Sequence, residues 1–279
     1  MKDKTTISPF LKWAGGKTQL LPIIDTLLPP KFNRYFEPFL GGGALLFHLQ
    51  PMEAVVNDNN HSLIHTYTMI RDNCDGFLKM IYLLDHNIPK DGMSYYNMLR
   101  KRYNDKICND KYDIELSALF VFLNKHCYNG LYRVNKEGLF NVPYNNSTRE
   151  SVSPRMIREV SNYLKNIIIM RGDFEKACKD VKEGDFVFID SPYAPLNPSS
   201  FKSYTKEGFS VESHKRVANL FHRLSEQHVY CMTTNHHTEL IDSLYANKGY
   251  DIQIVNVKRL INSDPSKRIG EEVIIRNYK

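Results

Sequence analysis

The chain has 279 residues, of which 42% are hydrophobic, enough for one large domain or two small ones. Lys and Arg outnumber Asp and Glu by 37 to 31, a moderate excess that suits a polyanionic partner without proving one. The five cysteines include no CxxC pair, which indicates reduced intracellular thiols rather than a disulfide or zinc framework. The sequence shows neither a signal-peptide pattern nor an apolar run that could span a membrane.

The first third of the chain has an α/β pattern. Apolar side chains at helical spacing predict a helix over residues 18–28, which two prolines end. The stretch "YFEPFLGGGALLFHL" predicts a short strand, a glycine-rich turn and a helix from Ala44. The stretch "EAVVND" predicts a second strand over residues 53–58, which ends in Asp58.

The middle of the chain, from about residue 60 to 167, looks like an insertion. Apolar stripes predict helices over residues 61–84, 93–103 and 113–127. The stretches "LYRV", "NKEG" and "LFNV" then predict two short strands around a four-residue turn, and residues 144–154 are polar and loop-like.

The α/β pattern resumes in the last third. Alternating strands and helices there predict a mostly parallel sheet covered by helices on both faces, with a closing antiparallel pair. The expected strands are 166–174, 185–190, 229–234, 250–258 and 271–278, the expected helices are 174–182, 211–226 and 237–247, and residues 194–209 form a long loop.

The glycine-rich turn and Asp58 are the first candidate site. A strand that enters a glycine turn and then a helix lets backbone N–H groups approach a ligand, and an acid at the end of the next strand can bind ribose hydroxyls. This pair suits an adenosine-bearing cofactor. The alternative is a structural turn beside an ordinary strand-end acid.

The stretch "WAGGKTQLL" resembles the end of a phosphate-binding loop, but Leu11 stands where that motif requires its first glycine. An NTPase is therefore a poor hypothesis. Lys17 could instead neutralise a ligand carboxylate, with Trp13 as an apolar wall, or the segment could simply be a helix start with a buried tryptophan.

The second candidate site follows the strand "FVFID". Asp190 can accept a hydrogen bond from an amino group, Pro192 holds Ser191 extended and so orients its carbonyl, and Tyr193 offers a ring face. Together they suit a planar ring with an exocyclic amine. The alternative is an ordinary polar turn at a strand end.

With these residues in place, the sequence resembles the adenine-specific, S-adenosylmethionine-dependent DNA methyltransferases of the Dam type. The motifs that carry the resemblance are "LKWAGGK", "YFEPFLGGGALLFHL", "VND", "YNGLYRVNKEGLFNVPY", "RGDFEKA" and "FVFIDSPY". The resemblance implies a Rossmann-like α/β methyltransferase domain from residues 1–59 and 168–279, with a helical and β-hairpin target-recognition domain from residues 60–167 inserted into it.

The resemblance also implies a role for each matching residue. The catalytic motif would be Asp190, Ser191, Pro192 and Tyr193. The cofactor-binding residues would be Trp13, Ala14, Gly15, Lys17, Glu37, Pro38, Phe39, Gly41, Gly42, Gly43, Asp58, Asp173, Phe174 and Asp190. The DNA-binding residues would be Lys12, Tyr128, Asn129, Leu131, Arg133, Asn135 and Pro143. Phosphate contacts are expected from Lys125, Arg133, Lys136, Arg149, Arg155 and Arg158, each of which could also lie on a merely solvated face.

Two residues depart from the family's pattern. Ser191 stands where proline is usual, and Asn145 follows "VPY" where glycine is usual. The first touches the chemistry, and the second affects a backbone contact.

We therefore expect a cytoplasmic, monomeric enzyme that methylates adenine N6 in double-stranded DNA, in the sequence GATC, without a metal or a membrane. A DNA-binding homologue that has lost catalysis through Ser191 is one alternative. Methylation of an amine in RNA or a small molecule is another, against which the hairpin motif argues.

Overall fold

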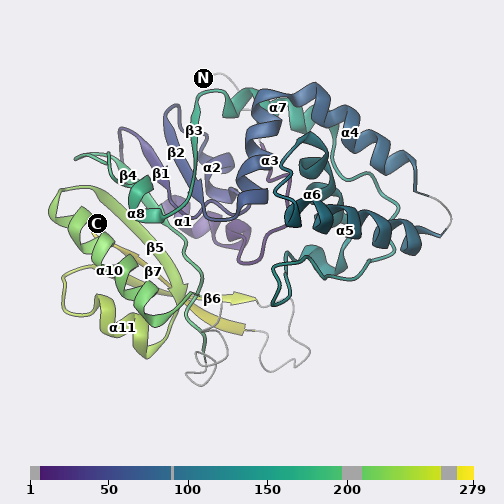
Figure 1. Cartoon of the computed structure of the whole chain (residues 1–279). Helices are drawn as coiled ribbons and strands as arrows, with labels where there is room; N and C mark the ends of the chain where they lie inside the picture. Colours follow the sequence, from purple (N-terminus) through teal and green to yellow (C-terminus); the bar gives the residue numbers. More distant parts are fainter. Residues whose placement is uncertain (1–6, 89–90, 197–208, 259–268) are drawn as a thin grey trace. The chain divides into compact units, whose positions relative to one another are not determined.

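The computed structural model describes residues 7–88, 91–196, 209–258 and 269–279. Seven strands form a sheet in the order β3-β2-β1-β4-β5-β7-β6 (Figure 1). The strands are β1 (Tyr35–Glu37), β2 (Ala54–Asp58), β3 (Ile167–Arg171), β4 (Phe186–Ile189), β5 (Tyr230–His236), β6 (Asp251–Lys258) and β7 (Ile269–Arg276).

The sheet is mostly parallel, which confirms the expected Rossmann-like α/β class. Strand β1 pairs in parallel with β2 and with β4, and β4 pairs in parallel with β5. Strand β7 then runs antiparallel to both β5 and β6, which confirms the closing pair. Because β2, β1 and β4 run the same way, the residues that follow them leave the sheet at one edge.

The central strand β4 shows why this sheet is stable. All four of its side chains are buried, as expected for a strand covered on both faces. The cluster around it includes Val217, Leu220 and Phe221 of helix α10 (Val211–Glu226), whose first turn is capped by the Ser210 side chain. The remaining short helical elements of this α/β part are η1 (Lys17–Gln19), α1 (Leu21–Leu27), α2 (Ala44–Leu49), α8 (Phe174–Ala177) and α11 (Glu239–Tyr245).

The helices of the inserted region differ from their prediction in two main ways. The helix expected over 61–84 is two helices, because Asn73 leaves the helical conformation at φ −141° and its side chain caps the next helix through the Gly76 N–H. A helix that was not predicted covers residues 154–164. The helices are α3 (His61–Asp72), α4 (Cys74–His86), α5 (Gly92–Cys108), α6 (Ile114–His126), η2 (Tyr128–Gly130) and α7 (Pro154–Leu164).

The predicted hairpin contains the turn but not two regular strands. Val134 and Phe140 form a single antiparallel bridge, and Cys127 and Tyr144 form another. Asn135 closes the turn, since its N–H donates to the Leu139 carbonyl at 2.9 Å and its carbonyl accepts from Gly138 at 3.0 Å.

The helix expected over 174–182 is only the four-residue α8, because Cys178 already leaves the helix as its C-cap. The loop expected over 194–209 lies largely outside the described residues.

The chain divides into two compact units. Unit 1 contains residues 1–18, 41–50 and 58–172, and unit 2 contains residues 19–40, 51–57 and 173–279. The glycine-rich turn thus belongs to the same unit as the inserted helices. Among the described helices, none is both long and apolar enough to cross a membrane.

Candidate active site and DNA-recognition loop

Asp58 holds the glycine-rich turn in unit 1. One carboxylate oxygen accepts the Gly41 N–H at 3.0 Å, and the other accepts the Asn60 N–H at 2.9 Å. Burial raises the pKa of Asp58, while hydrogen bonds from the Asn60, Gly41 and Asn59 backbone oppose this shift. Each carboxylate oxygen can accept a second hydrogen bond, so both can still bind a hydroxyl.

The turn requires glycine at position 41. Its φ of +50° is left-handed, and a Cβ there would lie 2.7 Å from Cδ1 of Trp13. Trp13 also stacks on Tyr132, with ring centroids 5.4 Å apart. Trp13 is therefore held between the glycine turn and the inserted region.

The residues after Trp13 form an exposed turn. Gly15 has φ +76°, and its carbonyl accepts a hydrogen bond from the buried Lys17 ammonium. Ala14 and Gly15 are exposed. Lys17 thus points back at its own turn, and the segment begins the short helix η1 rather than a phosphate-binding loop.

The motif after β4 is anchored by strand β5 in unit 2. Thr234 donates to Asp190 at 2.7 Å, and Asn235 accepts the Ala194 N–H at 2.8 Å. Nδ1 of His236 lies 2.7 Å from the Ala194 carbonyl, so it must donate there. These contacts fix both ends of the Asp190–Ala194 segment, and sequence patterns gave no sign of them.

Tyr193 and Ser191 differ in their surroundings. The Tyr193 hydroxyl donates to Glu272 at 2.8 Å, and burial together with Asp190 and Glu272 raises its pKa well above the usual value. Ser191 is only 2% exposed, and its hydroxyl has no hydrogen-bond partner among the described residues.

Asp173 and Phe174 lie beside Arg216 of α10. Arg216 donates to Asp173 at 2.8 Å, and its guanidinium lies 4.8 Å from the Phe174 ring centroid. Burial would raise the pKa of Asp173, but the hydrogen bonds from Arg216 and the Glu175 backbone prevail and lower it. The Phe174 ring also packs against Phe39, with centroids 5.1 Å apart. Asp173 is thus ionised, and Phe39 and Phe174 form an aromatic pair.

Glu37 ends β1 as a buried acid that is 3% exposed, and it accepts the Tyr35 hydroxyl at 2.9 Å. Pro38, which follows it, is buried, and its carbonyl accepts from Asn57 at 3.0 Å. Gly42 and Gly43 complete the turn, and Gly43 begins α2 with φ +66°.

Comparison with known proteins settles the family. The model of the D12 class N6 adenine-specific DNA methyltransferases matches residues 13–262. The chain belongs to this family. It is 41% identical to the type II methyltransferase M1.LlaDCHI of Lactococcus lactis subsp. cremoris, over 99% of this chain and 98% of that protein. It is 38% identical to the type II methyltransferase M.MjaIII of Methanocaldococcus jannaschii (98% and 99% covered) and 27% identical to the DNA adenine methylase of Escherichia coli K12 (97% and 95% covered).

Apart from Lys12, the expected DNA-binding residues of this DNA adenine methyltransferase lie between residues 128 and 143 in unit 1, a segment that we call the recognition loop. Tyr128 is 57% exposed, and Asn129 beside it has the uncommon φ of +56°. Arg133 is exposed, and its Nε donates to Asn141 at 2.9 Å, which leaves its terminal nitrogens for another partner. Lys12 and Pro143 are also exposed, Leu131 is half-buried, and Asn135 serves the turn described above.

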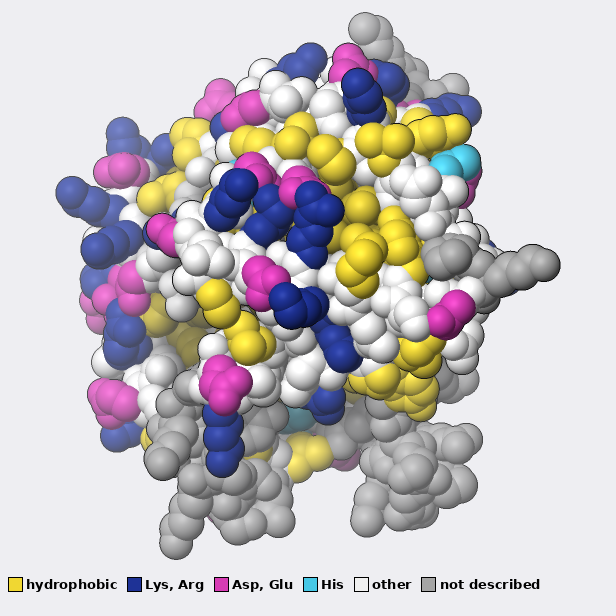
Figure 2. All heavy atoms as spheres, turned by 45° about the vertical axis from the view of Figure 1, so that its right-hand side comes forward, with side chains coloured by type: hydrophobic (Ala, Val, Ile, Leu, Met, Phe, Trp, Pro, Cys, Tyr) yellow, Lys and Arg dark blue, Asp and Glu magenta, His cyan; other side chains and the backbone are white. Residues whose placement is uncertain are grey.

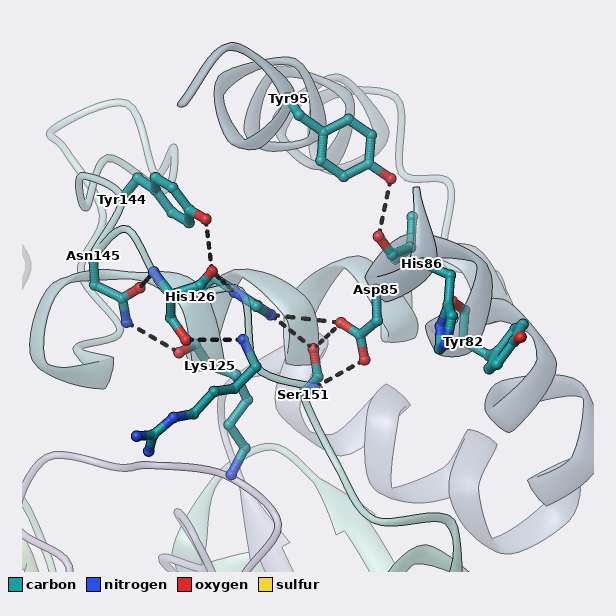
Figure 3. A network of polar contacts seen from close by, with 12 residues as sticks. Tyr82, Asp85, His86, Tyr95, Lys125, His126, Tyr144, Asn145 and Ser151 are labelled. Carbon is teal, nitrogen blue, oxygen red and sulfur yellow. Dashed lines mark hydrogen bonds and ion pairs between the residues drawn. The ribbon is translucent and has the colours of Figure 1, made fainter. Parts of the chain in front are cut away.

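A buried polar network supports this loop (Figure 3). Ser151 donates from its hydroxyl and its N–H to the two oxygens of Asp85 on α4, at 2.6 and 2.9 Å. His126 at the end of α6 lies 3.2 Å from the Ser151 hydroxyl. Asn145 donates to the Lys125 and Cys127 carbonyls at 3.2 and 3.1 Å, so this departure from the family's glycine ties the segment after Pro143 to α6.

The expected phosphate contacts are unequal. Arg155 pairs with Glu159 on its own helix at 3.0 Å, and Arg158 pairs with Asp75, whereas Lys136 and Arg149 are exposed. Figure 2 shows basic and acidic side chains interspersed on the face it presents, without a continuous basic patch. No cluster of three His, Cys, Asp or Glu side chains in the described ranges could hold a metal ion.

Proposed function

We propose that this enzyme transfers a methyl group from S-adenosylmethionine to N6 of an adenine flipped out of duplex DNA, within the sequence GATC. The observation that carries the proposal is the sheet edge. The glycine turn follows β1, Asp58 ends β2 and Asp190 follows β4, and these three strands are parallel neighbours. Ligands of such sheets bind beyond the carboxyl ends of the strands.

The residues present suit the proposed cofactor. Asp58 retains acceptor capacity for ribose hydroxyls, and Trp13, which packs on the Gly41 turn, offers an apolar wall. Phe39, half-buried against the buried Phe174 ring, offers an aromatic surface for an adenine, and Asp173 can accept from its amine. When bound, S-adenosylmethionine supplies an electrophilic sulfonium methyl group.

The catalytic motif suits the acceptor base. The lone pair of an adenine amine is delocalised into the ring, so the amine is a poor nucleophile. Asp190 would accept one N6 hydrogen and the Ser191 carbonyl the other, which favours a pyramidal nitrogen with an available lone pair. Tyr193 would stack on the ring while Thr234 and Glu272 hold the two side chains. Most of the catalysis is positioning and electrostatics.

Base flipping follows from this geometry, because the amine of a paired adenine is out of reach. Tyr128, exposed on the loop, would fill the vacated space. A duplex with 2-aminopurine in place of the target adenine tests this step. Its fluorescence should rise on binding the wild-type enzyme and less with Tyr128→Ala; an unchanged signal on a bound duplex would contradict flipping.

Arg133 is proposed to recognise a guanine, because arginine to a guanine edge is the commonest specific contact. Arg133→Ala should lose about 1–3 kcal/mol of preference at one base pair and keep most non-specific affinity. Equal loss of binding on every sequence would instead make Arg133 a phosphate contact.

The GATC assignment is tested on plasmid DNA. After incubation with enzyme and S-adenosylmethionine, the plasmid should resist a nuclease that cleaves only unmethylated GATC. Full cleavage, with methylation mapped elsewhere, would replace GATC by another site.

The relatives named type II methyltransferases favour a role in restriction–modification. The five free cysteines fit the reducing cytoplasm.

A further inference from the structure

Asn124, near the end of α6, makes an unusual set of contacts. Its side chain is 1% exposed and binds both main-chain groups of Lys12: the Lys12 N–H donates to Oδ1 at 2.9 Å, and Nδ2 donates to the Lys12 carbonyl at 2.8 Å. Nδ2 also donates to the Gly130 carbonyl at 3.2 Å. One buried amide therefore joins two segments that lie more than a hundred residues apart in sequence.

Lys12 also packs directly on Gly130. A Cβ at Gly130 would clash with Cδ of Lys12 and lie 2.6 Å from its Cβ, so only glycine leaves room for this side chain. Gly130 follows Asn129 in the exposed loop. Lys12 and the recognition loop thus pack against each other, and the buried Asn124 side chain is hydrogen-bonded to both.

The residue after Lys12 extends this contact to the glycine turn. Trp13 packs on Gly41 and Gly42 and stacks on Tyr132 of the recognition loop. Gly41 is held by Asp58. All of these residues belong to unit 1. A change at the glycine turn can therefore reach the loop by moving Trp13, and with it the backbone of Lys12 that Asn124 holds.

We propose that Asn124 is a positioning residue that couples cofactor binding to DNA recognition, through its hold on Lys12 and Gly130. This inference rests on the proposed function, because it takes the glycine turn to bind the cofactor and the loop to bind DNA. Coupling of this kind is reciprocal, so each ligand should tighten binding of the other by the same factor.

Asn104 provides a matched control. Its side chain makes the same two-point contact with Phe140, donating to the carbonyl at 3.0 Å and accepting from the N–H at 2.9 Å. It supports the same loop, but its hydrogen bonds within the described part of the chain join it to Phe140 and not to Lys12 or Gly130. Replacing either asparagine by aspartate keeps the acceptor and removes the donors.

The experiment measures the affinity of the enzyme for a duplex that contains its unmethylated target sequence, with and without S-adenosylhomocysteine. The wild type should bind DNA about 5- to 150-fold more tightly with S-adenosylhomocysteine, the usual range of coupling between sites. Asn124→Asp should reduce this factor to within about twofold of one, and Asn104→Asp should keep it. The inference would be overturned if Asn124→Asp kept the wild-type ratio of DNA affinities with and without S-adenosylhomocysteine. It would also be overturned if Asn104→Asp reduced this ratio as much as Asn124→Asp does.

Trp13 gives a second measurement because it is the only tryptophan in the chain. Its emission should change when DNA alone is added to the wild type or to Asn104→Asp, and stay constant in Asn124→Asp although that variant still binds DNA non-specifically. An equal change in all three would also overturn the inference. Absence of DNA methylation by the wild type would instead contradict the proposed function.

Discussion

Asp58 serves the protein's own backbone as well as its proposed ligand. Its two oxygens accept the Gly41 and Asn60 N–H groups, so the residue expected to bind ribose also shapes the glycine turn. Removing it leaves those two N–H groups without their acceptor, and an unsatisfied buried group costs about 1–3 kcal/mol. Loss of cofactor binding and loss of stability must therefore be separated in any test of this residue.

Two variants of Asp58 achieve this separation. Asp58→Ala should lower both the free energy of unfolding and the cofactor affinity, each by about 1–3 kcal/mol. Asp58→Asn keeps one acceptor oxygen and should lose less stability. Calorimetric titration with S-adenosylhomocysteine, beside thermal unfolding, measures the two effects. Unchanged affinity in a folded Asp58→Ala protein would remove Asp58 from the cofactor site.

Ser191 contributes a buried hydroxyl without a partner among the described residues. Ser191→Ala removes this hydroxyl and keeps the main-chain carbonyl, so the free energy of unfolding should rise by about 1 kcal/mol with methylation retained.

Ser191→Pro should change kcat by no more than about two- to fivefold, the effect of ~0.4–1 kcal/mol of preorganisation. An inactive wild type that Ser191→Pro restores by several orders of magnitude would establish a DNA-binding homologue that has lost catalysis.

Lys125 predicts a pH dependence. Burial and the nearby Lys12 ammonium lower the pKa of Lys125 to about 8. Its positive charge is present below this pH and is lost above it, so a phosphate contact through Lys125 should weaken as the pH rises from 7 to 9. Lys125→Arg should remove the dependence, because arginine stays charged. Fluorescence anisotropy of labelled duplex across this range is the measurement; parallel profiles for both proteins would exclude the contact.

At the scale of elements, the segment after Pro143 shows how a departure from the family's pattern is accommodated. Asn145 donates to the Lys125 and Cys127 carbonyls and accepts from Ser147, which a glycine could not do. Asn145→Gly should cost about 1–3 kcal/mol of stability and raise KM for DNA more than it lowers kcat. Asn146→Gly is the control, because Asn146 is exposed at φ +61° and glycine suits that conformation. Equal effects of the two substitutions would contradict this role.

The sequence predicts an element well when the contacts that stabilise the element are visible in its local pattern. Strand β4 and helix α10 carry their pattern locally, in an apolar run and in apolar residues at helical spacing. The break at Asn73 was missed because the apolar stripes continue across it, and α7 because its buried positions, such as Ile157 and Val160, follow a polar loop. The hairpin lacks a ladder because side chains hold it instead, as Asn104 holds Phe140.

The candidate site divides in the same way. Gly41, Asp58 and Asp190 could be found from sequence, because each stands in or at the end of a local motif. Thr234, Arg216 and Asn124 could not. They bind Asp190, Asp173 and Lys12 respectively, from polar positions of ordinary elements that only the tertiary fold brings to these partners. Arg216, for example, is one of several charged residues along α10.

At the scale of the whole molecule, the two compact units do not follow the boundaries at residues 59 and 168 expected for the two functions. The segment 41–50, with the glycine turn, clusters with the inserted helices, while β1, β4 and β5 belong to unit 2. We propose that residues 60–167 nevertheless carry target recognition. The glycine turn and the recognition loop then share one unit, which is where coupling between the two ligands would arise.

Asp190 is proposed above all to present an adenine amine for methylation. The most direct test is mass spectrometry of nucleosides from duplex DNA incubated with enzyme and S-adenosylmethionine. With the wild type, the methylated nucleoside should be N6-methyl-2′-deoxyadenosine. Folded Asp190→Ala should produce none. Methylation of cytosine, or undiminished adenine methylation by Asp190→Ala, would contradict the account.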